Sequence, residues 1–396
     1  MSGDYQLRIS TMRFVALFAI IPTLTFAEVD QGPANASFVP AFENQTRAPS
    51  LAQTTVEVTT FASGLERPWG ISALPGGQFV VTERPGRIRI INNDGSVTDP
   101  IKGHPSVSDD GQGGMLDVAA SPNFDTDRVL FWTYAKPVSG GAVTAAARGA
   151  LGTDGVLTDV RDIFVQSNPS EVGQHFGSRV IPMNDGTVWI TTGDRGAGDD
   201  GTFVQDITTT HGKVIRVMDT GGVPSSNPFV NQLGDNAVWS YGHRNMQGAA
   251  IGPDGSLYTI EHGPRGGDEL NKPIAGGNYG WPLVSYGMNY RGSDVSEGVA
   301  VLAGTEQPIY YWDPVIAPGG MAFYDGPYTD WQGDLLIGSL NPGALVRLKM
   351  DGDRVVGEER LLTDVGRVRD VEVTDDGRIF VLIDDTDGAI LEVVPN

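Results

Sequence analysis

The sequence of 396 residues is long enough for one large domain or two ordinary ones, and its composition excludes several classes of protein. It contains 53 Gly and 25 Pro with only 19% charged residues, which points away from helical bundles and coiled coils. The net charge of −22 would repel polyphosphates, so nucleic acid is not expected as a partner. The chain has no Cys, so any metal must be held by oxygen or imidazole.

Residues 1–27 have the features of an export signal. Arg8 and Arg13 give a basic start before an apolar run over residues 14–24. This run is too short to span a bilayer, and small residues follow it. A buried N-terminal helix is the alternative. We therefore expect a signal peptide and a periplasmic or secreted protein with no membrane insertion. Residues 28–52 are rich in Ala, Pro, Asn and Ser, and we expect a flexible lead-in there.

Beyond residue 52 one pattern recurs six times: a short apolar strand, a Gly/Asp turn and a second strand. The copies begin at Ile71, Asp117, Arg179, Ala249, Met321 and Val371. A repeat of this length, with strands and no helical period, is typical of a β-propeller blade. We predict an all-β fold over residues 53–396, a six-bladed β-propeller of four-stranded antiparallel blades. A strand at residues 55–60 would close the ring beside the last blade and hide its edge.

The hairpins also predict where functional residues gather. Each hairpin brings its two ends to one side of the ring, here called the loop end, while its tight turn lies on the other side, the turn end. In a propeller all loop-end segments converge on one central axis. The residues that this topology brings together are Gln112, His175, Asp194, Arg244, Asn245, Arg367 and Arg369, with residues 263–269 beside them.

Two features of this set indicate chemistry. An imidazole in a loop, such as His175, can take a proton near neutral pH, and Asp194 would orient it, although a structural histidine is the alternative. Arg244, Arg367 and Arg369 at one mouth of an acidic chain indicate an anionic ligand rich in carboxylates or phosphates. Salt bridges to nearby aspartates are the alternative for each arginine.

The segment from Gly263 to Glu269 could hold a cation. Gly263 and Pro264 offer main-chain carbonyls, and Asp268 and Glu269 offer carboxylates, which are the ligands that Ca²⁺ prefers. A solvated acidic loop explains the same residues equally well. The chain has no HExxH pattern, so a zinc hydrolase is not supported.

Several motifs, taken in order, carry a family resemblance. They are QGGMLDVA, HFGSR, TTGDRG, GHRNMQG, EHGPRGGDELN, GGNYGWP, IAPGGM and GRVRD. This series, over about residues 64–394, resembles the soluble quinoprotein sugar dehydrogenases of the glucose/sorbosone dehydrogenase family, and in length the shorter aldose sugar dehydrogenases. The resemblance implies a six-bladed propeller that binds pyrroloquinoline quinone (PQQ) and Ca²⁺. It implies oxidation of the anomeric hydroxyl of aldose sugars to lactones, with hydride transfer to PQQ.

The resemblance also implies a role for each motif residue. His175 matches the general base, Asp194 its carboxylate partner, and Gln112 the residue beside the substrate hydroxyl. Arg244 and Asn245 match the pair that contacts the quinone, and Arg367 and Arg369 match the residues that hold its carboxylates. Gly263 and Pro264 match carbonyl ligands of the cofactor Ca²⁺, whereas Asp268, Glu269 and Tyr279 fall where the family has a second, structural Ca²⁺.

One position departs from the family pattern. Asn341 stands where the family commonly has a Lys that contacts the quinone, so weaker cofactor binding is expected there. The expected partners are an aldose substrate and a separate electron acceptor, and the protein is expected to be a monomer. Two alternatives remain: a cofactor-free propeller that binds a glycan or protein, and a Ca²⁺-dependent lactonase. The lactonase would need several carboxylates at the axis, where this sequence places arginines.

Overall fold

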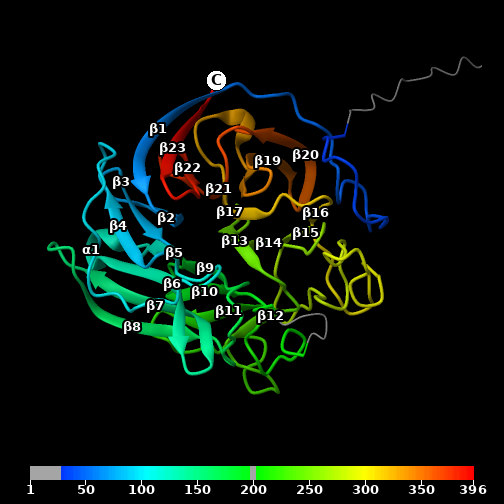
Figure 1. Cartoon of the computed structure of the whole chain (residues 1–396), viewed down its shortest axis with the longest axis horizontal. Coiled ribbons are helices and arrows are strands. Elements are labelled where there is room, and N and C mark those ends of the chain that lie inside the picture. Colours follow the sequence, from blue (N-terminus) through cyan, green and yellow to red (C-terminus); the bar gives the residue numbers. More distant parts are fainter. Residues whose placement is uncertain (1–27, 197–201) are drawn as a thin grey trace, which may run out of the picture.

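The ring of blades is the main feature of the structure, a computed structural model that describes residues 28–196 and 202–396. The predicted signal peptide at residues 1–27 lies outside the described residues. Six antiparallel sheets surround a central axis (Figure 1), which confirms the prediction of an all-β, six-bladed propeller. The innermost strands contact one another in succession and are β2 (Pro68–Leu74), β5 (Met115–Ala120), β9 (Gly177–Pro182), β13 (Met246–Ile251), β17 (Pro318–Phe323) and β21 (Val368–Val373).

The six sequence repeats form the inner hairpins of the blades. The second strands are β3 (Gln78–Glu83), β6 (Val129–Val138), β10 (Thr187–Thr192), β14 (Leu257–Glu261), β18 (Leu335–Ser339) and β22 (Ile379–Ile383). The third strands are β4 (Arg87–Ile91), β7 (Gly141–Leu151), β11 (Lys213–Met218), β15 (Asp268–Asn271), β19 (Ala344–Asp351) and β23 (Gly388–Pro395). The outermost strands of the second to fifth blades are β8 (Leu157–Val165), β12 (Val238–Tyr241), β16 (Tyr310–Trp312) and β20 (Arg354–Leu361). The short helices are α1 (Phe124–Asp127) and η1 (Thr329–Trp331).

The predicted closing strand is present and longer than expected. Strand β1 (Val56–Leu65) pairs antiparallel with β23, from Val56 opposite Pro395 to Leu65 opposite Gly388. It therefore completes the sixth blade with chain from the opposite terminus, and the ring has no free edge at the join.

The first blade differs from the predicted four strands, because its ladder contains only β2, β3 and β4. Residues 96–101 occupy the fourth position without forming a regular strand. The Thr98 amide donates to the Ile90 carbonyl at 3.0 Å, and the Ile101 amide donates to the Ile88 carbonyl at 2.8 Å. Pro100 lies between these two bonds and has no N–H to donate, which explains the interruption.

Apolar side chains between neighbouring blades hold the ring together. Val80 and Ile88 of the first blade pack with Val118, Leu130 and Trp132 of the second in one buried cluster. Because both faces of each sheet are covered in this way, the frame is rigid and the loops at its two ends can vary.

Residues 28–52 correct the expectation of a flexible lead-in, because this segment is anchored to the fourth and fifth blades. The buried Gln31 side chain donates to the Tyr310 hydroxyl at 3.1 Å and to Glu358 at 3.2 Å. The Leu51 amide donates to the Glu358 carbonyl at 3.0 Å. Composition alone missed these contacts because the partners lie about 260 to 330 residues away in the sequence.

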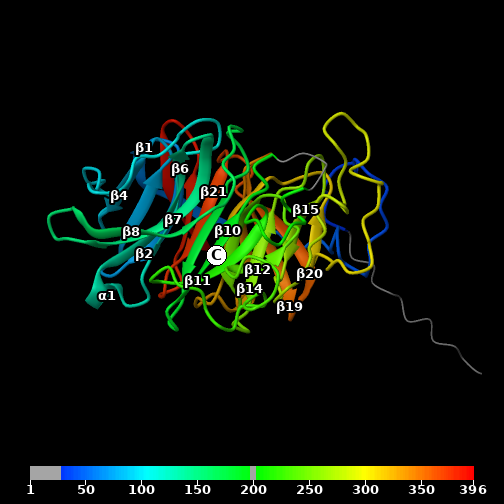
Figure 2. The ribbon, with the colours of Figure 1, turned by 90° about the horizontal axis from the view of Figure 1, so that it is seen from below.

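The two ends of the ring differ in the length of their loops. Figure 2 shows the ring edge-on, with α1 at the lower edge, which is the turn end, and a long yellow loop after β15 rising at the upper edge, the loop end. No helix of the described residues is long and apolar enough to cross a membrane.

Candidate active site

A cavity of about 180 Å³ opens on the axis at the loop end of the ring. It is built by residues that are far apart in the sequence and come from all six blades. Its lining residues are Arg67, Trp69, Arg84, Gln112, Leu116, Phe176, Gly177, Asn245, Gln247, His262, Leu340, Arg367, Arg369 and Asp384. Four of the seven residues that the topology brought together line this cavity: Gln112, Asn245, Arg367 and Arg369.

His175 and Asp194 form a buried pair beside this cavity. The His175 Nδ1 and Asp194 Oδ1 atoms are 2.7 Å apart, and the other Asp194 oxygen accepts a bond from the Trp281 indole N–H at 2.9 Å. A carboxylate facing Nδ1 assigns the proton to Nδ1 and leaves Nε2 as the acceptor. The arrangement therefore provides a base that is oriented by a carboxylate and a tryptophan.

Asp194 remains charged in spite of its burial. Burial alone would raise its pKa, but the hydrogen bond from His175, the charge of Arg244 and the Gly196 amide lower that pKa below its ordinary value. A carboxylate that stays ionised next to an imidazole stabilises the imidazolium that forms when Nε2 takes a proton. The pair therefore suits general-base chemistry.

Gln112 is tied directly to the loop that carries His175. Its Oε1 atom accepts the His175 main-chain N–H at 2.9 Å, and its own N–H donates to the Gly173 carbonyl at 2.7 Å. The two loops approach so closely that a Cβ on Gly111 would lie 2.1 Å from the Gly173 oxygen. Glycine is therefore required at position 111 for this contact.

Arg244 and Asn245 lie between the base and the cation candidates. The Arg244 Nη1 atom donates to the carbonyls of His262 and Gly263 at 3.0 and 2.8 Å, and the guanidinium lies 5.2 Å from the Trp281 ring centroid. Its buried Nε has no protein partner among the described residues. The Asn245 side-chain oxygen accepts the Gly177 amide at 3.1 Å.

Arg367 and Arg369 share one carboxylate on the opposite wall of the cavity. Asp384 Oδ2 lies 3.0 Å from Arg367 Nη2 and 3.2 Å from Arg369 Nη2. Burial lowers the pKa of Arg369 to about 10, with Asp384 acting in the opposite direction. A single carboxylate cannot pair with all the N–H groups of two guanidinium groups. In addition, the buried Arg369 Nε has no partner in the described part of the chain. The pair is therefore free to bind an anion.

Sequence reasoning missed several lining residues: Arg67, Trp69, Arg84, His262 and Asp384. The two arginines follow the same topological rule as the others, since Arg67 precedes the first inner hairpin and Arg84 follows it, so a search of all loop-end arginines would have found them. Burial, together with Arg244 and Arg369, lowers the pKa of His262 to about 3, so this imidazole is neutral and adds no charge to the cavity.

Asn341 is exposed and does not line the cavity, although its neighbour Leu340 does. Its main-chain N–H donates to the Ile316 carbonyl at 3.4 Å. The structure therefore does not bring Asn341 together with the four arginines of the cavity wall.

Gly263 and Pro264, the proposed carbonyl ligands of a cation, are buried next to Arg244. The Gly263 carbonyl accepts Arg244 at 2.8 Å, and the Pro264 carbonyl accepts no hydrogen bond from the described residues. A cation at this point would compete with Arg244 for the Gly263 oxygen.

Asp268, which the resemblance places at a structural Ca²⁺, accepts hydrogen bonds from three main-chain amides. Its Oδ1 atom accepts the Gly263 amide, and its Oδ2 atom accepts the amides of Ile316 and Ala317, all at 2.8 Å. Burial raises its pKa to about 7. Both oxygens are occupied by main-chain donors, so Asp268 clamps the loop that carries Gly263 to the start of the fifth blade.

Glu269 faces a second buried carboxylate, Glu261, which lies directly opposite it in the β14–β15 ladder. Burial and the charge of Glu261 raise the pKa of Glu269 well above its ordinary value. Both residues line a cavity of about 10 Å³ together with Tyr279, which is the size of one small guest. The Tyr279 hydroxyl donates to the Lys272 carbonyl at 2.5 Å and accepts the Ile274 amide at 3.1 Å, which leaves its main-chain oxygen as the freer ligand for a cation.

The described residues contain no cluster of three or more His, Cys, Asp or Glu side chains arranged to hold a metal. The Glu261–Glu269 site would therefore rely on two carboxylates and on main-chain oxygens, a set that suits Ca²⁺ better than Zn²⁺.

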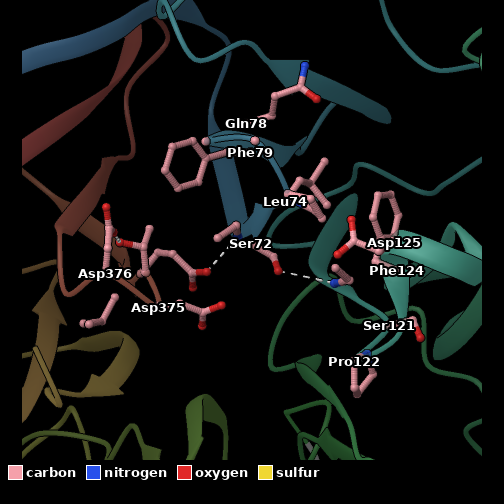
Figure 3. Close-up of a pocket in the computed structure, with 18 of the residues that line it drawn as sticks. Ser72, Leu74, Gln78, Phe79, Ser121, Pro122, Phe124, Asp125, Asp375 and Asp376 are labelled. Atoms are coloured by element: carbon pink, nitrogen blue, oxygen red, sulfur yellow. Dashed lines mark hydrogen bonds between the residues drawn. The ribbon is translucent and has the colours of Figure 1, made fainter.

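A larger cavity, of about 740 Å³, lies at the turn end. Figure 3 shows its walls, with Asp375 and Asp376 on one side, Asp125 and Phe124 on another, and Gln78 above. It contains no histidine and only one arginine, Arg378. Its size alone therefore does not make it a candidate for the chemistry that His175 offers.

Comparisons with known proteins agree with this geometry. The family model for glucose/sorbosone dehydrogenase matches residues 65–392. The chain is 39% identical to the aldose sugar dehydrogenase YliI of Escherichia coli, over 87% of this chain and 94% of that protein. The crystal structure of the soluble aldose sugar dehydrogenase from E. coli in its apo form superposes with a TM-score of 0.83 at 38% identity, covering 86% of this chain and 100% of that one.

A further solved structure, the PQQ-bound aldose sugar dehydrogenase from Streptomyces coelicolor, superposes with a TM-score of 0.72 at 26% identity, over 87% of this chain and 99% of that one. The resemblance seen in the motifs is thus confirmed, and the chain belongs to the glucose/sorbosone dehydrogenase family.

Proposed function

We propose that this protein is a PQQ-dependent aldose sugar dehydrogenase that oxidises the anomeric hydroxyl of its substrate to a lactone. The observation that carries this proposal is the His175–Asp194 pair, 2.7 Å apart, beside a cavity lined by four arginines. A proton acceptor next to a strongly positive cavity suits a reaction in which an alcohol loses a proton and a hydride together, with an anionic acceptor held close by.

The residues of the cavity fit PQQ. The cofactor has three carboxylates, and the lining supplies four arginines against one aspartate. The buried Nε atoms of Arg244 and Arg369, which lack protein partners among the described residues, are donors for such a ligand. Arg244 and Asn245 would hold the quinone edge, and Arg367 and Arg369 would hold carboxylates.

The residues also fit two calcium ions. Gly263 and Pro264 would bind a cofactor Ca²⁺ through their carbonyls once Arg244 turns from Gly263 to the cofactor. Glu261 and Glu269, with the Tyr279 carbonyl, would bind a structural Ca²⁺ that relieves the repulsion between two buried carboxylates. Asp268 would support both sites by fixing the loop between them.

Bound PQQ would supply the hydride acceptor, and Ca²⁺ beside its carbonyls would supply an electrophile. The protein's own part is to hold and move the proton. His175 Nε2 takes the proton of the anomeric hydroxyl, and Asp194 stabilises the imidazolium through Nδ1. Gln112, fixed to the His175 amide, lies where it can orient the same hydroxyl.

The location of the enzyme and its need for an electron acceptor are proposed from the sequence. The export signal predicted at residues 1–27 favours a periplasmic or secreted location, and the reduced cofactor requires a separate electron acceptor. We propose that the enzyme works as a monomer, since one ring supplies both the His175–Asp194 pair and the four arginines of the cavity.

Reconstitution tests the proposal. Purified protein is titrated with PQQ in the presence of Ca²⁺, and reduction of an artificial dye is measured with a panel of aldoses. Activity should require both additions, should be abolished by EDTA and should return with Ca²⁺ but poorly with Zn²⁺. Dye reduction by the metal-stripped protein without PQQ, or no PQQ binding at all, would contradict the proposal.

A further inference from the structure

Two arginines of the first blade, Arg67 and Arg84, line the axial cavity next to the sixth blade. Their main chains are joined, because the Arg84 N–H donates to the Arg67 carbonyl at 3.0 Å. The Arg67 N–H in turn donates to the Asp385 carbonyl at 2.7 Å, next to the carboxylate that Arg367 and Arg369 share. The four guanidinium groups therefore belong to one cavity but come from two blades.

The orientation of Arg84 is fixed by neutral partners. Its Nε donates to the Gly113 carbonyl at 3.1 Å and its Nη2 donates to the Gly111 carbonyl. One side of the guanidinium group is therefore bonded to the loop that carries Gln112. A Cβ on Gly114 would lie 2.2 Å from the Arg84 oxygen, so the main chain of Arg84 is packed closely as well. Nη1 has no hydrogen-bond partner among the described residues.

The charge of this pair is not balanced by the protein. Arg84 makes no ion pair with any described carboxylate, and burial and the charges of Arg67 and Arg367 lower its pKa, which Asp384 and Asp109 only partly oppose. Arg67 lies 4.0 Å from Asp384, the carboxylate that Arg367 and Arg369 already use. A group of arginines with unbalanced positive charge is typical of a cavity in which a bound anion neutralises that charge.

Arg67 also has a strained main chain. Its φ angle is +44°, in the left-handed region where glycine is favoured, and a side chain there costs about 1 kcal/mol or more. The chain nevertheless keeps a long, charged side chain at this point of the cavity wall.

We propose that Arg84 and Arg67 form a second carboxylate-binding pair, beside the Arg367–Arg369 pair of the neighbouring sixth blade. This inference rests on the proposed function. It explains how the cavity keeps its charge although Asn341 supplies none. The carboxylate is either one of those of PQQ or that of an acidic aldose such as glucuronate, which carries an oxidisable anomeric hydroxyl and a carboxylate in one molecule.

The experiment measures PQQ binding and substrate preference in the same set of variants. The dissociation constant for PQQ, with Ca²⁺ present, is measured by calorimetry and by quenching of tryptophan fluorescence, since Trp69 lines the cavity. The variants are R84Q, R84K and R67Q. In reconstituted enzyme, KM is measured for glucose and for glucuronate.

If the pair holds PQQ, R84Q should weaken PQQ binding about tenfold, the usual difference between a charged and a neutral hydrogen bond, and R84K should recover part of it. R67Q should weaken binding less, because its side chain is 46% exposed. If the pair holds the substrate, PQQ binding should stay unchanged while KM rises about tenfold for glucuronate and not for glucose.

The control is R161Q, which removes an exposed arginine from strand β8 on the rim of the ring. It removes the same charge and should change neither quantity. If R84Q and R67Q both fold, by circular dichroism, and match R161Q in PQQ binding and in both KM values, the inference is wrong. If R84Q does not fold, R67Q, at an exposed position, decides by the same criterion. Failure of the wild-type protein to bind PQQ would instead contradict the proposed function.

Discussion

The two ends of the propeller axis have opposite charge although the same hairpins build both. The loop-end cavity has four arginines and one aspartate in its wall, whereas the turn-end cavity has four carboxylates and one arginine. The turn-end cavity is about four times larger. The difference teaches that the chemistry of the lining, and not the volume, distinguishes the site, because only the loop end combines a positioned base with excess positive charge.

A buried ionic cluster links the inner strands of the ring. Arg179 Nη1 lies 2.9 Å from Asp117 Oδ1 and 2.9 Å from Asp370 Oδ2, and its guanidinium lies 4.5 Å from the centroid of the Trp69 ring. These residues come from the second, third and sixth blades together with the first, so the cluster joins opposite sides of the ring. The cluster therefore ties inner strands of four blades together, and its Trp69 also lines the loop-end cavity.

The largest expected effect concerns the chemistry of the loop end. H175Q should retain PQQ binding but lower the rate of sugar-dependent dye reduction by roughly 10²- to 10⁴-fold, because glutamine cannot accept the proton. D376N at the turn end, which also alters one polar side chain of a cavity, should leave the rate unchanged. Turnover of H175Q near that of the wild type would remove the assignment of the base.

The next effect concerns the buried ionic cluster. R179M should lower the free energy of unfolding by about 3–5 kcal/mol, because it leaves Asp117 and Asp370 buried and facing each other without a cation. Burial already raises the pKa of Asp117 to about 6 in spite of Arg179. The measurement is urea unfolding at pH 7. A loss below about 1 kcal/mol would show that Arg179 does not balance the two buried carboxylates.

The third effect is a pH dependence that arises beside the loop end. Lys213 is fully buried, and its Nζ donates to the carbonyls of Phe203, Val204 and His211 at 3.0, 2.7 and 2.6 Å. Burial lowers its pKa to about 7, with Asp206 and Asp235 acting in the opposite direction. The lysine thereby holds the loop whose Gln205 donates to the Trp281 carbonyl, next to the indole that fixes Asp194.

The sign of this dependence follows from the two pKa values. Between pH 7 and about pH 10 the unfolded chain carries the proton that folded Lys213 has lost, so this group makes the free energy of unfolding rise with pH, by at most about 1.4 kcal/mol per pH unit. Urea unfolding of wild type and K213M at pH 6, 7, 8 and 9 should show this rise in their difference. K349M, at an exposed position, should run parallel to the wild type. A pH-independent difference between wild type and K213M would exclude the titration.

Sequence patterns predicted the fold because it depends on local signals that repeat. The six hairpins and the strand at residues 55–60 could be placed by alternation and by turn residues. The third hairpin then brings His175 and Asp194 together, and ring closure gathers the loop-end arginines. The roles that depend on individual long-range contacts could not be predicted. The sequence pattern does not indicate the three main-chain donors of Asp268. Nor does it indicate the partners of Gln31 on the fourth and fifth blades.

The smallest expected effect concerns Asn341. The resemblance implies that a lysine here would tighten PQQ binding by about five- to thirtyfold, the value of one charge-assisted hydrogen bond. The structure leads to a smaller expectation, because Asn341 is exposed and outside the lining, and a charge in solvent is largely screened beyond about 8 Å at physiological salt. N341K should therefore tighten binding by no more than about threefold at 0.15 M salt, and somewhat more at 0.01 M, where screening extends to about 30 Å. An increase in PQQ affinity above tenfold at 0.15 M salt would mean that a side chain at position 341 reaches the cofactor. It would also mean that Arg84 and Arg67 do not replace the positive charge missing at that position.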